Sequence, residues 1–188
     1  MNETINSILS RRSTREFDDK TVDEGLMKAI IEAGSFAPSG LNKQPWYFTV
    51  IENKELIKKL NVDTKAVIGK TKLENYKAID NEAKDDIFYG APVVVLVSRD
   101  TLLPHSAIDC AVASENMLIA AESLGISSCW TGTVGLLFHF DEEKGKQYQI
   151  ELGLPENYMV SHALVFGYGK KAKAVAAKRK DDFVKYIR

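Results

Sequence analysis

The sequence predicts a single compact globular domain, or a small two-part fold, that combines helices with buried strands. Of its 188 residues, 45% are hydrophobic and 27% are charged, which excludes disordered and collagen-like chains and allows a sizeable core. The apolar run 93–97 is typical of a strand covered on both faces. Residues 107–124 place apolar and small side chains almost all round a helix, so we expect that helix to be buried on more than one side.

The N-terminal half shows helices and one strand in sequence. Residues 5–9 carry an apolar helical face that runs into a basic cluster. Thr21 and Glu24 fit a capping box that opens a helix ending near Phe36, before Pro38. Residues 47–51 form an apolar strand, and Asn53 can cap a short helix through residue 60. The polar stretch 61–82 has a weak helical stripe, and we expect a surface or lid-like segment there.

The C-terminal half also alternates between expected helices and strands. Gly125 can end the 107–124 helix, and the strand 126–130 then leads into a turn at 131–135 with bare backbone amides. A charged helix at 141–150 precedes a strand at 159–168. The last residues include Phe183, Val184 and Ile187, so we expect the tail to dock on another surface.

Charge and cysteine use narrow the class of protein. The formal net charge is -1, with 25 basic and 26 acidic residues, which argues against a dedicated nucleic-acid-binding protein. No apolar run reaches the roughly 18 to 20 residues of a membrane span, and the N-terminus has no apolar signal region. Cys110 and Cys129 form no Cys-x-x-Cys pattern. We therefore expect a cytoplasmic protein without nucleic-acid or membrane partners.

A dense basic cluster stands near the N-terminus. Arg11, Arg12 and Arg15 fall within five residues, and Ser13 adds a hydroxyl. Guanidinium groups bind phosphate oxygens in a forked geometry, so the cluster suits one ligand phosphate. An ordinary solvated helix end is the alternative, because cations are favoured there by the helix dipole.

A polar loop at 37–46 is the second candidate binding segment. Ser39, Asn42 and Gln44 offer hydroxyl and amide groups, and Gly40 permits close backbone approach. An ordinary helix-to-strand turn would use the same residue types, and the sequence leaves both interpretations open.

Common catalytic motifs are absent from the sequence. It contains no Gly-x-Gly-x-x-Gly after a predicted strand, no Walker loop, no His-Glu-x-x-His and no Gly-x-Ser-x-Gly. His105, His139 and His162 are too scattered for a metal site. Polar binding groups without a nucleophile or an acid/base pair suit a protein whose cofactor performs the chemistry.

Five motifs together resemble those of the FMN-dependent nitroreductase family. They are the 11–17 cluster, the 37–46 loop, Gly90-Ala91-Pro92, the 125–132 turn and Phe166-Gly167-Tyr168-Gly169. The resemblance implies an α+β fold with a mostly antiparallel sheet flanked by helices, in an intertwined homodimer with FMN at the interface. It also implies a single domain over 1–188, in which the flavin takes hydride from NADH or NADPH in a ping-pong cycle and reduces a small acceptor such as a nitroaromatic or a quinone.

The resemblance also assigns cofactor-binding residues, and it assigns no catalytic side chain and no metal. Arg11, Ser13 and Arg15 match the positions that hold the ribityl chain, phosphate and flavin edge. The partner subunit's loop contributes Pro38, Ser39, Gly40 and Asn42, and the backbone of Thr131, Gly132 and Thr133 approaches flavin N5 and O4. The remaining candidates are Arg12, Gln44 and, for the phosphate, Lys178, Arg179 and Lys180.

Two departures from the family leave alternatives open. The segment 61–84 lacks a clear counterpart of the flavin-binding asparagine and lysine pair, and the chain is short, so the acceptor is not fixed. Another flavin reaction, such as dehalogenation or enone reduction, and a non-catalytic FMN-binding or storage protein are the alternatives. An adaptor for phosphorylated partners would also use the arginine cluster.

Overall fold

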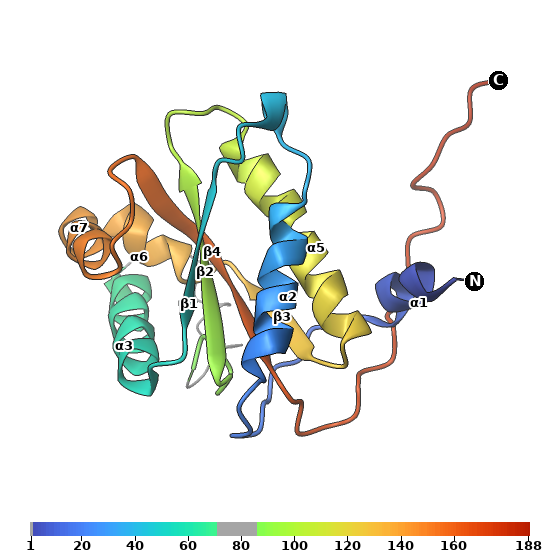
Figure 1. Ribbon diagram of the computed structural model, residues 1–188, viewed down its shortest axis with the longest axis horizontal. Coiled ribbons are helices and arrows are strands. Elements are labelled where there is room, and N and C mark those ends of the chain that lie inside the picture. The colour runs from blue at the N-terminus through green and yellow to red at the C-terminus, as the bar shows by residue number, and fades with distance from the viewer. Residues whose placement is uncertain (1, 71–85) are drawn as a thin grey trace.

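The fold has three layers, in which one antiparallel sheet lies between two layers of helices. The computed structural model describes residues 2–70 and 86–188. The strands run in the order β1-β2-β4-β3, with every neighbouring pair antiparallel. Helices α2 and α5 cover one face of the sheet, and α3, α6 and α7 lie on the other (Figure 1). The predicted α+β arrangement, a mostly antiparallel sheet between helices, is therefore confirmed.

The strands are β1 (Trp46–Ile51), β2 (Val93–Asp100), β3 (Ser127–Thr131) and β4 (Tyr158–Gly167). The helices are α1 (Glu3–Ser10), α2 (Glu24–Ser35), the short 3-10 helix η1 (Gly40–Asn42), α3 (Lys54–Lys70), α5 (Ser106–Ser123), α6 (Gly135–Phe140) and α7 (Glu142–Glu151).

The core consists of two apolar clusters separated by the central strands β2 and β4. Val95 and Leu164 pack with Met117 of α5 on one face. On the other face, Leu96 belongs to the same cluster as Leu137 of α6. Residues 93–97 are all buried, as expected of a strand covered on both faces.

Several helix boundaries differ from the sequence expectations. Helix α2 is capped by Asp23, whose carboxylate accepts from the Gly25 and Leu26 amides at 2.8 and 3.1 Å, so the capping box on Thr21 is wrong. Asn53 caps α3 as predicted, accepting from the Leu56 amide at 3.0 Å. That helix continues to Lys70, past the predicted end, and the remainder of the 61–82 expectation falls outside the described residues. Helix α6 was not predicted.

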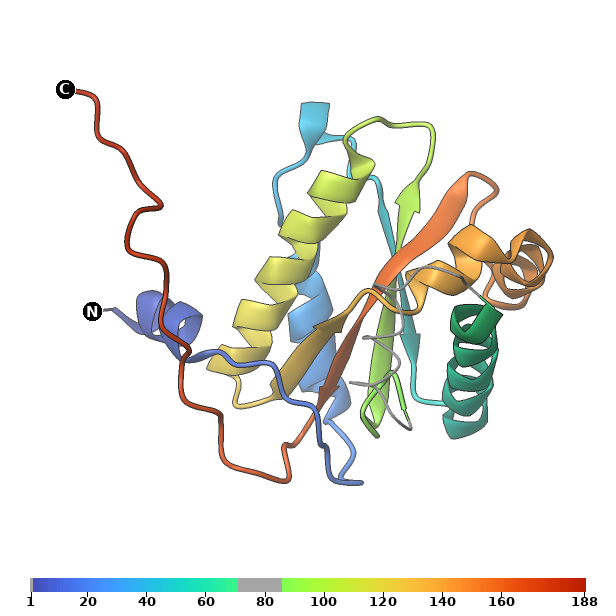
Figure 2. The same ribbon diagram turned by 180° about the vertical axis from the view of Figure 1, so that it is seen from behind.

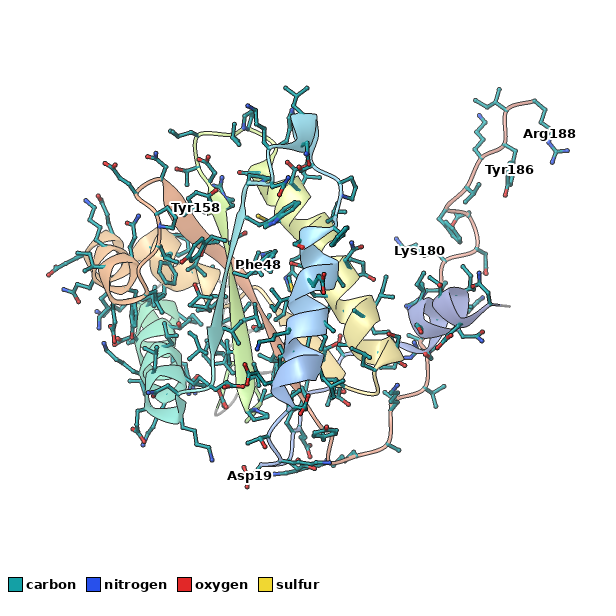
Figure 3. The ribbon with its side chains drawn as sticks, in the orientation of Figure 1. Asp19, Phe48, Tyr158, Lys180, Tyr186 and Arg188 are labelled. Carbon is teal, nitrogen blue, oxygen red and sulfur yellow. The ribbon has the colours of Figure 1, made fainter. Side chains whose placement is uncertain are left out.

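The C-terminal tail beyond β4 is extended and exposed. Residues 174–188 contain no helix or strand, and Tyr186 and Arg188 lie at its far end, away from the sheet (Figure 3). Phe183 and Ile187 are 75% and 89% exposed. Across the described parts of the chain, no helix is both long and apolar enough to cross a membrane.

Candidate functional site

The basic segment that follows α1 is fixed against β3 and against the chain that follows β4. Ser13 forms a bridge with Ser128 of β3, and the Thr14 amide donates to the Ser128 carbonyl at 2.9 Å. Further along, the Lys170 amide donates to the Glu16 carbonyl at 3.1 Å. Figure 2 shows this segment crossing the start of β3. The helix-to-loop junction predicted for the arginines is therefore built onto the β3 edge of the sheet.

Three of the predicted binding residues gather around one buried thiol on β3. Burial raises the pKa of Cys129, whereas the positive charge of Arg15, a hydrogen bond with Ser13 and the charge of Arg11 act in the opposite direction. The Arg15 guanidinium also lies over the Tyr89 ring, 5.9 Å from its centroid. The bridge at Ser13 thus holds this basic segment beside β3, and Arg12, Ser13 and Arg15 line one pocket there.

Arg12 turns back toward the helix that precedes it. One guanidinium nitrogen donates to the Leu9 carbonyl at 2.8 Å and to the Arg11 carbonyl at 2.6 Å. These carbonyls lie at the C-terminal end of α1, where acceptors lack helical partners. The Nε atom of Arg12 is buried and has no hydrogen-bond partner among the described residues. Arg12 therefore stabilises the end of α1, and its contact with a ligand stays a prediction.

The turn at 131–135 starts where β3 ends, three residues after the Ser128 bridge to the basic segment. Its backbone folds tightly, since the Gly135 amide donates to the Gly132 carbonyl and the Leu136 amide to the Thr133 carbonyl, each at 3.1 Å. The Thr131 side chain is 3% exposed, and its hydroxyl finds no hydrogen-bond partner in the described parts of the chain. A buried hydroxyl without a partner costs free energy, which a polar ligand at this turn would recover.

The 37–46 loop is conformationally strained. Leu41, Asn42 and Gln44 have φ values of 52°, 52° and 49°, in the left-handed region that non-glycine residues rarely adopt. Each such residue costs on the order of 1 kcal/mol, and such strain is concentrated at functional sites. Leu41 is also 92% exposed, so packing within the chain does not explain its conformation.

Side chains hold this strained loop in place. The Ser39 hydroxyl accepts from the Gln44 amide at 2.9 Å, and the Gln44 side chain donates to Asn42 Oδ1 at 3.1 Å. From α5, the Asp109 carboxylate accepts from the Gly40 amide at 3.3 Å. Pro38 precedes this set in the chain. The loop is therefore tied to the N-terminal end of α5.

The arginine cluster lies at the opposite end of the same helix. Glu122, in the last turn of α5, accepts from the Ser10 hydroxyl at 2.7 Å, directly before Arg11. Asp109 and Glu122 are 13 positions apart, which corresponds to about 20 Å along a helix. Figure 1 shows η1 at one end of α5 and α1 at the other. One chain therefore keeps its two candidate binding segments well apart.

Basic residues of the tail lie near the arginines, although not the ones predicted. Lys171 pairs with Glu16 at 2.6 Å, and Lys173 pairs with Glu122. Together with residues 12–16, residues 171–174 line a shallow pocket of about 170 Å³. Lys178, Arg179 and Lys180 lie on the exposed tail, where Lys178 pairs with Asp181 at 2.9 Å. Their phosphate contact stays a prediction.

Known proteins resemble this chain in both sequence and fold. The sequence model of the nitroreductase family matches residues 8–168. An Archaeoglobus fulgidus protein named "Putative NADH dehydrogenase/NAD(P)H nitroreductase" is 32% identical over 92% of this chain and 89% of its own length. A nitroreductase with bound FMN from Desulfitobacterium hafniense DCB-2 matches at a TM-score of 0.92 and 30% identity, and one from Bacteroides fragilis NCTC 9343 at 0.90 and 32%. Both structural matches cover 100% of each chain.

Proposed function

Because the chain belongs to the nitroreductase family, we propose that it is an FMN-dependent oxidoreductase using NADH or NADPH to reduce a small acceptor such as a nitroaromatic or a quinone. The observation that carries the proposal is the basic segment 11–15 held against β3 by the Ser13–Ser128 bridge, on the strand that ends at Thr131, whose buried hydroxyl has no partner among the described residues. When bound, FMN supplies the hydride transfer between nicotinamide and acceptor in a ping-pong cycle.

The residues present fit this cofactor. Guanidinium groups bind phosphate with charge-assisted hydrogen bonds, a role that suits Arg11, and Ser13 offers a hydroxyl for the ribityl chain. We assign Arg15 to the flavin edge, where a fixed positive charge stabilises negative charge that develops during reduction. The backbone amides of residues 131–133 add preorganised dipoles at the same site.

Side-chain thiols do not supply the chemistry in this proposal. Cys110 is completely buried, and its burial raises its pKa to about 12, so the thiol stays protonated. The pKa of Cys129 is also raised. Both cysteines are free and buried, which supports a reducing, cytoplasmic location.

We further propose a homodimer in which two chains complete each site. The arginine cluster and the 37–46 loop lie at opposite ends of α5, so a two-fold axis across antiparallel α5 helices would place one chain's loop at its partner's arginines. Helix α5 supports this arrangement because Ile108 and Val112 on it are 64% and 37% exposed, and Leu124 at its C-cap is 38% exposed. Phe183, Val184 and Ile187 of the tail would pack on the partner.

A groove beside the edge strand β1 offers the tail a docking surface. It has a volume of about 470 Å³, and its lining includes Met27, Ile31 and Val50, three glutamates (Glu24, Glu32 and Glu52) and one cation, Lys28, which pairs with Glu24. The tail carries exposed apolar residues and several cations, which complement an apolar, acidic groove. An exposed strand edge can also pair with an extended segment of another chain.

The visible absorption spectrum of the purified protein tests the function. We expect flavin bands that bleach on anaerobic addition of NADH or NADPH and return when an acceptor is added. Flavin that neither nucleotide bleaches would favour a storage protein instead. A colourless protein that takes up no added FMN would refute the proposed function.

A further inference from the structure

A buried polar pair joins α5 to the middle of β4, behind the 131–135 turn. Ser114 Oγ donates to the Cys110 carbonyl at 2.8 Å. The same oxygen lies 2.7 Å from His162 Nε2. The donor in this second bond depends on the tautomer of His162, and either tautomer joins the edge of the imidazole to Ser114.

His162 carries Trp130 on its face. The two rings are stacked with their centroids 4.0 Å apart and their planes within 11°. His162 is 4% exposed, whereas Trp130 is 37% exposed. Trp130 comes directly before Thr131, the first residue of the turn. The stack therefore holds the strand residue that precedes the turn.

The other end of the turn rests on the residue next to His162. A Cβ at Gly135 would lie 2.3 Å from the Ser161 carbonyl oxygen, so only glycine fits there without a backbone shift. The β2–β4 register passes from His162 to Val160 between adjacent β2 residues, which leaves Ser161 as the extra residue of a β-bulge. Bulges re-aim neighbouring side chains and often lie next to active sites. Positions 161 and 162 thus hold both ends of the turn.

We propose that His162 is a positioning residue for the 131–135 turn, acting through Trp130 to orient the backbone amides that residues 131–133 would present to FMN. This rests on the proposed FMN site. The imidazole combines a flat face, which stacks on the indole, with an edge nitrogen that bonds to Ser114. The edge bond fixes the rotation of the ring, and the ring in turn fixes the plane of Trp130.

The two contributions can be separated by substitution. His162→Ala removes both the stack and the edge bond, whereas His162→Phe retains an aromatic face without the bond. Ser114→Ala keeps the imidazole and removes its hydrogen-bond partner. Phe48→Ala is the matched control, because it removes the ring that stacks on the other tryptophan, Trp46. Both residues lie on β1, and their ring centroids are 6.2 Å apart.

The readouts are the FMN dissociation constant and the midpoint potential of bound FMN, measured with the melting temperature. For His162→Ala we expect FMN affinity to fall about tenfold or more, and the potential to become more negative because misplaced amides stabilise the reduced form less. His162→Phe should recover most of this loss, and Ser114→Ala should show an intermediate loss. Phe48→Ala should lower the melting temperature with little change in either flavin readout.

A lower melting temperature with unchanged affinity and potential in His162→Ala would overturn the proposal and leave His162 a packing residue. If that variant does not fold, the same result in Ser114→Ala would overturn it. Wild-type protein that binds no FMN would instead refute the proposed function, so the two failures are distinguishable.

Discussion

His162 should make the folded state sensitive to mild acid. Burial lowers the pKa of His162 to about 4, whereas the ring in the unfolded chain titrates near its ordinary value of about 6.5. Between these values the unfolded chain binds a proton that the folded chain does not, so the free energy of unfolding falls as the pH falls. The contribution is complete above about pH 6.5 and is lost by about pH 4.

The magnitude follows from the width of that window. A difference of about 2.5 pKa units corresponds to about 3 kcal/mol, at about 1.4 kcal/mol for each pH unit. His162→Phe removes the titrating group and keeps an aromatic face under Trp130. Carboxylates such as Asp63 and Glu122, whose pKa values are also shifted, remain in both proteins and cancel in the comparison.

Urea unfolding followed by fluorescence at several pH values measures this difference. The protein concentration is held constant, because the stability of a dimer depends on it. We expect the free energy of unfolding of the wild type, taken relative to that of the variant, to decrease steadily as the pH falls from 7. A difference that stays constant from pH 7 to about pH 4.5 would show that the folded protein accepts the proton, and would refute the buried neutral imidazole.

Three substitutions test other parts of the site. Arg15→Ala should weaken FMN retention by about 1.5 to 3 kcal/mol, or about ten- to more than a hundredfold in a binding titration, whereas Lys146→Ala, a cation removed from the exposed face of α7, should not. Val112→Glu should place a charge in the proposed α5 interface, and we expect a monomer in light scattering and weak FMN binding in a titration. A dimer that keeps its flavin would contradict the proposed interface. Gly135→Ala should cost about 3 kcal/mol in urea unfolding because its Cβ would meet the Ser161 carbonyl, and an unchanged midpoint would contradict that close approach.

The elements set by local pattern could be predicted from the sequence. The apolar run 93–97 and the helix at 107–124 appear as β2 and α5 because continuous burial leaves a plain hydrophobic pattern. The cap of α2 was misassigned to Thr21 because Asp23 is an equally good capping residue two positions later. Helix α3 extends further than predicted, and its buried Val67 and Ile68 continue the apolar face of the predicted helix.

The site was less predictable because its residues meet only in three dimensions. Arg11, Ser13 and Arg15 were identified from their chemistry, but their approach to Cys129 depends on the bridge from Ser13 to β3. Lys171 and Lys173 were missed because their nearness to residues 12–16 arises from the path of the chain after β4. The separation of the two candidate binding segments along α5 is likewise a property of the fold.

The strain in the 37–46 loop bears on whether this segment is an ordinary turn or the flavin-binding loop that we propose. Three left-handed residues cost on the order of 1 kcal/mol each, and the contacts from Ser39 and Asp109 are exposed hydrogen bonds of modest strength. A loop preorganised for a ligand would have a reason to keep that strain, because rigidity lowers the entropy lost on binding.

Ser39→Ala tests this distinction, because it removes the acceptor for the Gln44 amide while changing little buried surface. We expect the free energy of unfolding to change by less than about 1 kcal/mol, since the bond is exposed, and FMN affinity to fall about threefold or more because the loop loses its fixed shape. Ser35→Ala is the matched control, removing an exposed hydroxyl that donates to the Glu32 carbonyl at 2.7 Å. Equal FMN affinity in the two variants would make the loop an ordinary turn, and the strain at Leu41 and Asn42 would then need a cause outside the flavin site.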